Sequence, residues 1–334
     1  MNKLNTNHLS IIEKARNLSE VDYNYPLEAM IPNNIMFEVT NMCNLKCKMC
    51  YNKYMKRKRG FMQFDLYKKI IDQVHELKIE NLALYTTGES FLHPQIFNFI
   101  EYAKKKDIKY VYITTNGQTL NDEKIEKIFK TGLDSIKFSI DAGNKDQYEF
   151  LKPGADWEKL IRIIKRIRNI RDKYKYKLKI FASFIVMKDN FKDLINYNRI
   201  FNDLIDETVF TLIINQGSQV NTNNSYPEYF KSIINDSILP KKQWTPCSFL
   251  WNRFVVTYEG YLTICCMDFE NQLIYGDLNK ESLKDCWNNE KMKKFRKIHK
   301  FKEFKKLKMC SDCDSIKRNK KAIDIINKEL LQYQ

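Results

Sequence analysis

The hydrophobic residues of this chain alternate between two spacings from residue 31 onward. Short apolar runs rich in β-branched and aromatic residues predict strands at 35–40, 81–86, 109–114, 135–140, 178–187 and 208–214. Between them, apolar residues at helical spacing predict helices, most clearly at 66–77, 96–103 and 160–170. Six strand–helix alternations indicate an α/β fold with a parallel sheet, and a count below eight favours an incomplete (β/α)6 barrel.

Changes in this pattern divide the chain into five predicted segments. These are a short helical extension and loop at 1–30, the barrel at 31–214, a polar, turn-rich linker at 215–243, a small cysteine-rich domain at 244–317, and a C-terminal helix at 318–334. Because catalytic groups in such barrels lie at the C-terminal ends of the strands, the residues that follow each strand are the candidates for a site.

The composition is that of a globular protein. Of the 334 residues, 43% are hydrophobic and 13% aromatic, and no apolar run is long enough to span a membrane. The N-terminal residues lack the apolar core of a signal peptide, and the nine cysteines therefore predict a reducing, cytoplasmic location. The net charge of +16 has two interpretations: solvated basic helix faces, or attraction of an acidic substrate such as a phosphorylated or nucleotide-linked sugar. No nucleic-acid-binding module is recognisable, so we expect no nucleic-acid partner.

Three cysteines follow the first predicted strand. Cys43, Cys47 and Cys50 lie close together in the sequence, and clustered thiols in a chain without secretory features point to a metal site before a disulfide. A tetrahedral zinc site would need a fourth protein ligand, and none is near in the sequence. A [4Fe–4S] cluster held by three thiolates leaves one iron open to an outside ligand.

The spacing Cys-x3-Cys-x2-Cys resembles that of the radical S-adenosylmethionine (SAM) superfamily. The resemblance implies a partial barrel and a [4Fe–4S] cluster that binds SAM through its open iron. It also implies one-electron cleavage of SAM to a 5′-deoxyadenosyl radical, with an electron donor of the flavodoxin or ferredoxin type. Cys43, Cys47 and Cys50 are then the catalytic cluster ligands.

The stretch Thr86–Ser90, after the second predicted strand, resembles the Gly-Gly-Glu-Pro motif of that family. The resemblance implies that Gly88 lets the backbone approach SAM and that Glu89 accepts hydrogen bonds from the methionine ammonium. Thr87 replaces the first glycine of the motif, and a serine replaces its proline. Met49 stands where the family most often has an aromatic residue, and we expect it to pack against the adenine.

Polar residues at the ends of the next three strands complete the SAM site that the resemblance implies. Asn116 lies in a Thr-Thr-Asn-Gly turn, and Ser139 and Asp141 follow as candidates for the ribose or the carboxylate. Ser183, on the fifth strand, is a candidate for the ribose and adenine. Ordinary strand-end hydrogen bonds are the alternative for Ser139, Asp141 and Ser183.

Four further cysteines lie in the C-terminal part, at Cys247, Cys265, Cys310 and Cys313. Apolar runs around Glu259–Gly260 predict a β-hairpin between the first two, and the last two form a Cys-x2-Cys knuckle. On these residues alone, zinc and a [4Fe–4S] cluster are about equally suited. The spacing Cys-x12-Gly-x4-Cys resembles the SPASM and twitch domains of radical SAM enzymes, which implies one fully ligated auxiliary [4Fe–4S] cluster. Cys266 and Cys286 are left over as packed, structural residues.

Several functions are open on this basis. The leading prediction is a radical SAM oxidoreductase of the 2-deoxy-scyllo-inosamine dehydrogenase type. Such an enzyme oxidises a carbohydrate-like small molecule and passes an electron to the auxiliary cluster. Arg253 and the basic segment 53–59 are candidates for substrate contact. The alternative is a SPASM-type maturase that modifies a ribosomally made peptide. Other radical SAM reactions, such as epimerisation or dehydration, and a non-catalytic metal-binding role are the further candidates.

Overall fold

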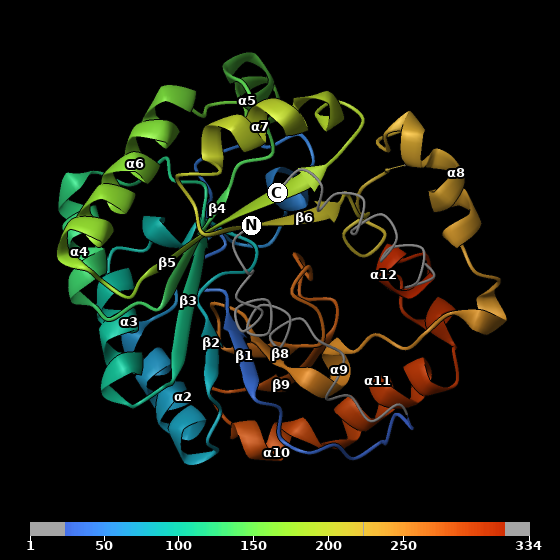
Figure 1. Ribbon diagram of the computed structural model, residues 1–334. Helices are drawn as coiled ribbons and strands as arrows, with labels where there is room; N and C mark the ends of the chain where they lie inside the picture. Colours follow the sequence, from blue (N-terminus) through green and yellow to red (C-terminus); the bar gives the residue numbers. More distant parts are fainter. Residues whose placement is uncertain (1–23, 223, 318–334) are drawn as a thin grey trace.

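The computed structural model describes residues 24–222 and 224–317. Most of the predicted N-terminal extension and the predicted helix at 318–334 lie outside these residues. A single nine-stranded sheet runs through the described chain, in the order β6-β5-β4-β3-β2-β1-β7-β8-β9 (Figure 1). It begins as the wall of a barrel and continues into the cysteine-rich domain.

In the described part of the chain, six parallel strands form the barrel wall. They are β1 (Asn34–Phe37), β2 (Asn81–Ala83), β3 (Tyr110–Thr115), β4 (Ser135–Ser139), β5 (Lys179–Val186) and β6 (Glu207–Leu212). Each pairs in parallel with the next one along the chain. The predicted α/β partial barrel is therefore confirmed, with strand ends shifted by a few residues.

Helices on the outer side of this wall connect the strands (Figure 1). They are α2 (Phe64–Glu76), α3 (Ile96–Lys105), α4 (Asp122–Lys130), α5 (Lys145–Leu151), α6 (Trp157–Tyr174) and α7 (Leu194–Phe201). The helices with the clearest periodicity in the sequence, α2, α3 and α6, are among them. Asn121 begins α4 by accepting a hydrogen bond from the backbone N–H of Lys124, and Asp156 begins α6 in the same way with Lys159.

The cysteine-rich domain joins the barrel sheet instead of forming a separate one. β7 (Phe254–Val256) pairs in parallel with β1, and β8 (Tyr261–Thr263) pairs antiparallel with β7 and with β9 (Ile274–Asp277). The predicted hairpin is confirmed, and its turn contains Gly260 with a φ of 91°, a conformation that favours glycine. The accompanying helices are α9 (Phe249–Asn252), α10 (Leu283–Trp287), α11 (Glu290–Lys300) and α12 (Asp314–Lys317).

The predicted linker at residues 215–243 is more structured than its composition suggests. It contains helix α8 (Glu228–Ser237), whose Phe230 and Ile234 are buried. Its first residues form a turn that contacts both cysteine regions. The helix is short, and its few apolar residues lie among Asn and Ser, so its helical spacing is weak in the sequence.

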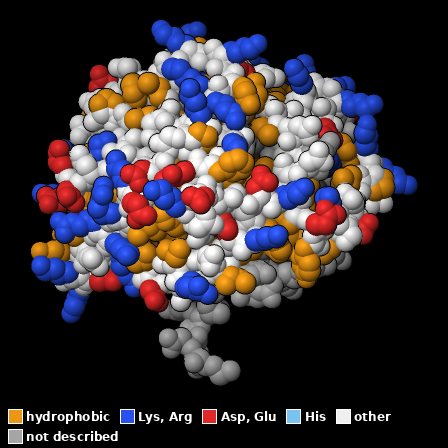
Figure 2. Space-filling model, turned by 90° about the horizontal axis from the view of Figure 1, so that it is seen from above, with side chains coloured by type: hydrophobic (Ala, Val, Ile, Leu, Met, Phe, Trp, Pro, Cys, Tyr) orange, Lys and Arg blue, Asp and Glu red, His pale blue; other side chains and the backbone are white. Residues whose placement is uncertain are grey.

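Basic side chains are spread across the face of the molecule that Figure 2 shows, with acidic side chains between them. On that face, the distribution favours solvated basic surfaces as the source of the net charge of +16. Within the described ranges, no helix has both the length and the apolar character needed to cross a membrane.

Candidate functional site

Cys43, Cys47 and Cys50 lie on the loop that leaves the C-terminal end of β1 and leads to a 3-10 helix at Tyr51–Tyr54. All three thiols are partly buried. Burial raises the pKa of the Cys43 thiol to about 12, and the charges of Cys47 and Cys50 act in the same direction. The three thiols are therefore electrostatic neighbours, as their spacing in the sequence suggested.

The surroundings of these thiols fit a cluster held by three thiolates. Burial raises the pKa of Cys47, and the charge of Lys152 opposes this effect. The backbone N–H of Asn52 lies 3.4 Å from Cys50 Sγ and stabilises its charged form. Because burial keeps the free thiols protonated, we expect cluster binding to release protons. Among the described residues, no three His, Cys, Asp or Glu side chains are arranged around a single metal ion.

Gly88, on the loop after β2, brings the barrel backbone against the cysteine loop. A Cβ atom at this position would lie 2.3 Å from the carbonyl oxygen of Thr40 and 2.7 Å from that of Met42. The neighbouring Glu89 N–H donates to the same Met42 oxygen at 2.8 Å. Only glycine fits at position 88, because any side chain would collide with the backbone of the cysteine loop. The sequence motif gave a different reason for this glycine, namely that it lets the backbone approach SAM.

Glu89 links the ends of two strands beside the first cysteines. Its carboxylate accepts hydrogen bonds from Thr115 Oγ1 and Asn116 N, both at 2.7 Å. Burial raises the pKa of Glu89, and these hydrogen bonds oppose that shift. The charge of Glu89 also contributes to the raised pKa of Cys43, and the Asn116 side-chain amide lies 4.0 Å from Cys43 Sγ. The structure thus brings Glu89 and Asn116 to the first cysteine site.

Asp141 and Lys152 form a buried ion pair whose charges act on Cys47. Asp141 follows β4 with a φ of 64°, and its Oδ2 accepts a hydrogen bond from Lys152 Nζ at 2.6 Å. Its Oδ1 accepts one from the backbone N–H of Ile185 at 2.7 Å. Both carboxylate oxygens are therefore engaged within the protein, and the charge that acts most on Cys47 is that of Lys152. No motif or periodicity in the sequence pointed to Lys152.

The remaining candidates for SAM contact are Ser139, Ser183 and Met49. Ser139 and Ser183 stand opposite each other on the paired strands β4 and β5. Met49 is buried in the core, and its carbonyl oxygen accepts a hydrogen bond from Gln216 Nε2 at 2.7 Å. Their contacts with SAM stay predictions.

Four cysteines from three parts of the chain form the second set: Cys247, Cys265, Cys310 and Cys313. Burial raises the pKa of Cys247 to about 12, and the charge of Cys313 acts in the same direction. Burial also raises the pKa of Cys310, reinforced by the charges of Cys247 and Cys313. Cys265 is affected in the same way by burial, by the adjacent Cys266 and by Cys247. The four thiols are therefore electrostatic neighbours, with Cys266 beside them, and their role as ligands of one cluster stays a prediction.

The two other conspicuous residues near this set are Arg253 and His299. Arg253, a candidate for substrate contact in the sequence, is buried, and its guanidinium stacks over Phe249 at 4.0 Å. Its charge opposes the effect of burial on the pKa of Cys247. His299 Nδ1 accepts a hydrogen bond from the backbone N–H of Cys247 at 3.2 Å, and burial lowers its pKa to about 3, so the ring is neutral. Nothing in the sequence singled out His299.

Cys286, the remaining leftover cysteine, has a packing role. It is fully buried, and a Cβ atom added at Gly276 would lie 2.5 Å from its Sγ. The sulfur therefore fills the space that the glycine leaves open, in agreement with its interpretation as a structural residue.

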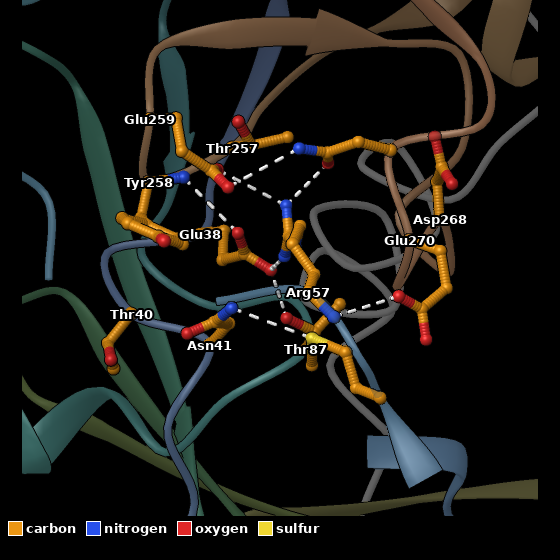
Figure 3. Close-up of polar contacts among 12 residues, drawn as sticks. Glu38, Thr40, Asn41, Arg57, Thr87, Thr257, Tyr258, Glu259, Asp268 and Glu270 are labelled. Carbon is orange, nitrogen blue, oxygen red and sulfur yellow. Dashed lines mark hydrogen bonds and ion pairs between the residues drawn. The ribbon is translucent and has the colours of Figure 1, made fainter. Parts of the chain in front are cut away.

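Arg57, from the basic segment after the cysteines, lies in a buried polar network (Figure 3). Its Nη2 lies 2.5 Å from Glu38 Oε1, and its Nη1 lies 3.2 Å from Glu259 Oε2. The hydroxyl of Thr87 and the backbone N–H of Tyr258 also donate to Glu38. Partners distant in sequence neutralise the charge of Arg57, and its contact with a substrate stays a prediction. The network joins the barrel to the β7–β8 turn.

Comparison with known proteins matches both cysteine sets to known domains. A family model described as "Radical SAM superfamily" matches residues 37–193, and one described as "Iron-sulfur cluster-binding domain" (SPASM) matches residues 247–314. The chain is 24% identical over 326 residues to the tungsten-containing aldehyde ferredoxin oxidoreductase cofactor-modifying protein of Pyrococcus furiosus, which covers 85% of this chain and 89% of the relative.

A second relative and a solved structure extend the comparison. The chain is 24% identical over 292 residues to the S-adenosyl-L-methionine-dependent 2-deoxy-scyllo-inosamine dehydrogenase of Niallia circulans, covering 84% of this chain and 92% of the relative. The crystal structure of Streptococcus suis SuiB bound to precursor peptide SuiA has a TM-score of 0.63 at 14% identity. It covers 86% of this chain and 69% of SuiB, and shows that the two share a fold.

Proposed function

Since the chain belongs to the radical SAM superfamily and carries a SPASM-type iron–sulfur domain, we propose that it oxidises a carbohydrate-like small molecule. Its cofactors are SAM, a SAM-binding [4Fe–4S] cluster and an auxiliary cluster. When bound, these supply an electron that cleaves SAM, a deoxyadenosyl radical that takes a hydrogen atom from a substrate carbon, and an acceptor for the electron left behind. If that carbon bears a hydroxyl group, release of the hydroxyl proton completes the oxidation to a ketone.

The chain's own residues divide between holding the cofactors and orienting SAM. We assign Cys43, Cys47 and Cys50 to the first cluster, with one iron left open for SAM. Glu89 offers a carboxylate to the SAM ammonium, and Lys152 offers a buried positive charge beside Cys47. The electron for SAM cleavage comes, in this proposal, from a flavodoxin- or ferredoxin-like donor in a reducing cytoplasm.

The proposal that the second cluster accepts an electron rests on the four thiols of the second set, which are electrostatic neighbours. Four thiolates complete the ligands of a [4Fe–4S] cluster, so no iron is left to bind substrate, and such a cluster is suited to accept an electron. A dehydrogenase is also among the relatives whose length the chain matches almost in full.

The test measures how deoxyadenosine and oxidised product are coupled. Aminocyclitols and sugar phosphates, deuterated at their ring carbons, are incubated anaerobically with SAM and a reductant. We expect deuterium in deoxyadenosine and an equimolar ketone. The variant Cys310→Ala with Cys313→Ala should still form deoxyadenosine but little ketone, whereas Cys286→Ala, outside both sets, keeps the two products equimolar. A folded variant that lacks the second cluster yet stays equimolar would refute the electron-acceptor role.

Modification of a ribosomally made peptide is the second candidate. It is supported by the shared fold with SuiB, which was solved with a precursor peptide. Peptides encoded next to the gene, incubated under the same conditions, would then receive the modification and transfer the deuterium. Transfer from a peptide and from none of the small molecules would favour this candidate over the first.

A further inference from the structure

The turn at residues 215–219, directly after β6, has an unusual backbone. Three successive residues have positive φ angles: Gln216 (48°), Gly217 (69°) and Ser218 (62°). Non-glycine residues rarely adopt this conformation, and they persist in it where surrounding contacts hold them. The contacts that hold this turn come from both cysteine regions.

On one side, Gln216 holds the loop of the first cysteine set. Its Nε2 donates to the carbonyl oxygen of Met49 at 2.7 Å, and its Oε1 accepts from the backbone N–H of Tyr51 at 3.1 Å. These two backbone groups flank Cys50. Because one amide end donates and the other accepts, the pair of bonds fixes both the position and the orientation of the Gln216 side chain.

On the other side, Gln219 reaches the loop that follows Cys265. Its Nε2 donates to the Gln216 carbonyl oxygen at 2.5 Å and to the Met267 carbonyl oxygen at 2.8 Å. The backbone N–H of Met267 in turn lies 3.4 Å from Cys265 Sγ. A continuous series of hydrogen bonds therefore leads from the residues flanking Cys50 to a cysteine of the second set.

The same turn also holds the knuckle of the second set. Ser218 Oγ donates to the carbonyl oxygen of Met309 and accepts from the backbone N–H of Asp312, both at 3.2 Å. Asn215 Nδ2 donates to the carbonyl oxygen of Asp312 at 2.7 Å. A Cβ atom at Gly217 would lie 3.0 Å from Met309 Cε, so the turn packs closely against the residue before Cys310.

We propose that Gln216 is a positioning residue that couples the two cluster sites, with Gln219 as the link to the second. The turn fixes the backbone around Cys50 relative to Cys265 and to the Cys310–Cys313 knuckle. A change at the second cluster therefore alters the electronic properties and the SAM affinity of the first. This inference rests on the cysteine assignments of the proposed function but not on its substrate.

The experiment is a double-mutant cycle read out on the first cluster. The SAM affinity and the EPR spectrum of the reduced first cluster, with and without SAM, are measured with the second set intact and in Cys310→Ala with Cys313→Ala. In the parent, loss of the second cluster should weaken SAM binding by about twofold or more and shift the spectrum. In Gln216→Ala the same loss should change neither quantity. In Gln219→Ala it should change both less than in the parent, because the contacts of Ser218 and Asn215 with the knuckle remain.

Gln73→Ala is the matched control. Gln73 Oε1 accepts a hydrogen bond from Leu283 N at 2.8 Å, which joins the barrel to the C-terminal domain at another place, so this variant should keep the coupling.

If Gln216→Ala takes up no iron at the first site, Gln219→Ala becomes the test of the coupling, because it leaves both bonds from Gln216 to the cysteine loop intact. Equal responses in parent and Gln219→Ala would overturn the proposal. Iron is counted first in the parent: a single cluster would refute the cysteine assignments, whereas two clusters that do not influence each other would refute only the coupling.

Discussion

The two cysteine sets differ in how the chain builds them. The first lies on one loop, at residues 43–50, whereas the second collects cysteines from positions between 247 and 313. A loop after a single strand places its thiols through local backbone geometry. The second set forms only when the β7–β8 hairpin and the knuckle before α12 are both folded. The first set is therefore a local feature of the chain and the second a tertiary one.

The two sets are alike in the charges around them and differ in the number of thiols. The first has the carboxylate of Glu89 near Cys43 and the ammonium of Lys152 near Cys47. The second has the cation of Arg253 and the carboxylates of Asp268 and Asp314. Because three thiolates leave one iron of a cluster open to a ligand such as SAM and four leave none, the number of thiols separates the roles that we assign to the two sets.

The largest effect expected from this difference is on SAM cleavage. Cys43→Ala with Cys47→Ala and Cys50→Ala should abolish deoxyadenosine formation, because no open iron remains. Anaerobically reconstituted protein should hold about eight irons per chain, and this variant about four. Cys310→Ala with Cys313→Ala should lose as much iron but still cleave SAM. Iron analysis and deoxyadenosine assays measure both quantities, and stoichiometric zinc with only four irons in the wild type would contradict the auxiliary cluster.

The same difference explains which site residues could be predicted from the sequence. Glu89 and Asn116 come shortly after predicted strands and lie in stretches that resemble motifs of the family, so strand topology and resemblance together predicted their place beside the first cysteines. Lys152 and His299 lie in segments without a motif, and only the tertiary fold brings them to a site. Arg57 looked like an exposed basic residue because its acidic partners are distant in the sequence.

The limits on predicting the fold have a similar origin. The six barrel strands are short apolar runs, so spacing alone located them. The parallel pairing of β7 with β1 joins residues more than two hundred positions apart, which no local pattern records. The polar residues of the turn at 215–219 predict a linker, because the contacts that these residues make appear only in the folded chain.

The next largest effect is expected where the two regions meet, at the buried pair of Arg57 and Glu38. Their side chains are only 7% and 3% exposed. Arg57→Ala leaves the Glu38 carboxylate buried without its cation, and removal of one partner of a buried pair typically costs about 3–5 kcal/mol. Denaturant unfolding under anaerobic conditions measures the loss in the free energy of unfolding.

The matched control for this variant is Arg168→Ala on α6. Arg168 pairs with Asp172 at 2.5 Å and lies 3.6 Å from Asp206, but the three side chains are 28%, 51% and 24% exposed. Exposed pairs contribute about 0–1 kcal/mol, so this variant should be nearly as stable as the wild type. Equal losses in the two variants would show that the junction contributes no more than an ordinary surface contact.

A smaller effect, confined to the first set, is expected from Glu89→Gln. The substitution keeps the size of the side chain but removes the ionised acceptor that we assign to the SAM ammonium. Hydrogen bonds to charged groups contribute about 1.5–3 kcal/mol, so SAM affinity should fall roughly ten- to hundredfold while the iron content is kept. Glu101→Gln, exposed on α3, is the control. Unchanged affinity in anaerobic equilibrium dialysis would place the SAM ammonium elsewhere.

The smallest effect concerns the pH dependence of stability at the junction of the two regions. Burial raises the pKa of Glu38 from its ordinary value of 4.5, although Arg57 and Thr87 oppose the shift. Between 4.5 and the raised value, the folded protein holds a proton on Glu38 that the unfolded chain has lost. The free energy of unfolding therefore falls as the pH rises through this interval, and the stabilising contribution of the Glu38 proton is fully present only below it.

The variant Glu38→Gln cannot titrate at this position, so its free energy of unfolding should depend less steeply on pH in this interval than that of the wild type. Glu89, whose pKa burial also raises, is present in both proteins, and the difference between the two curves isolates Glu38. Denaturant unfolding of the metal-free protein at several pH values measures both slopes, and parallel curves would mean that Glu38 titrates as it does in the unfolded chain.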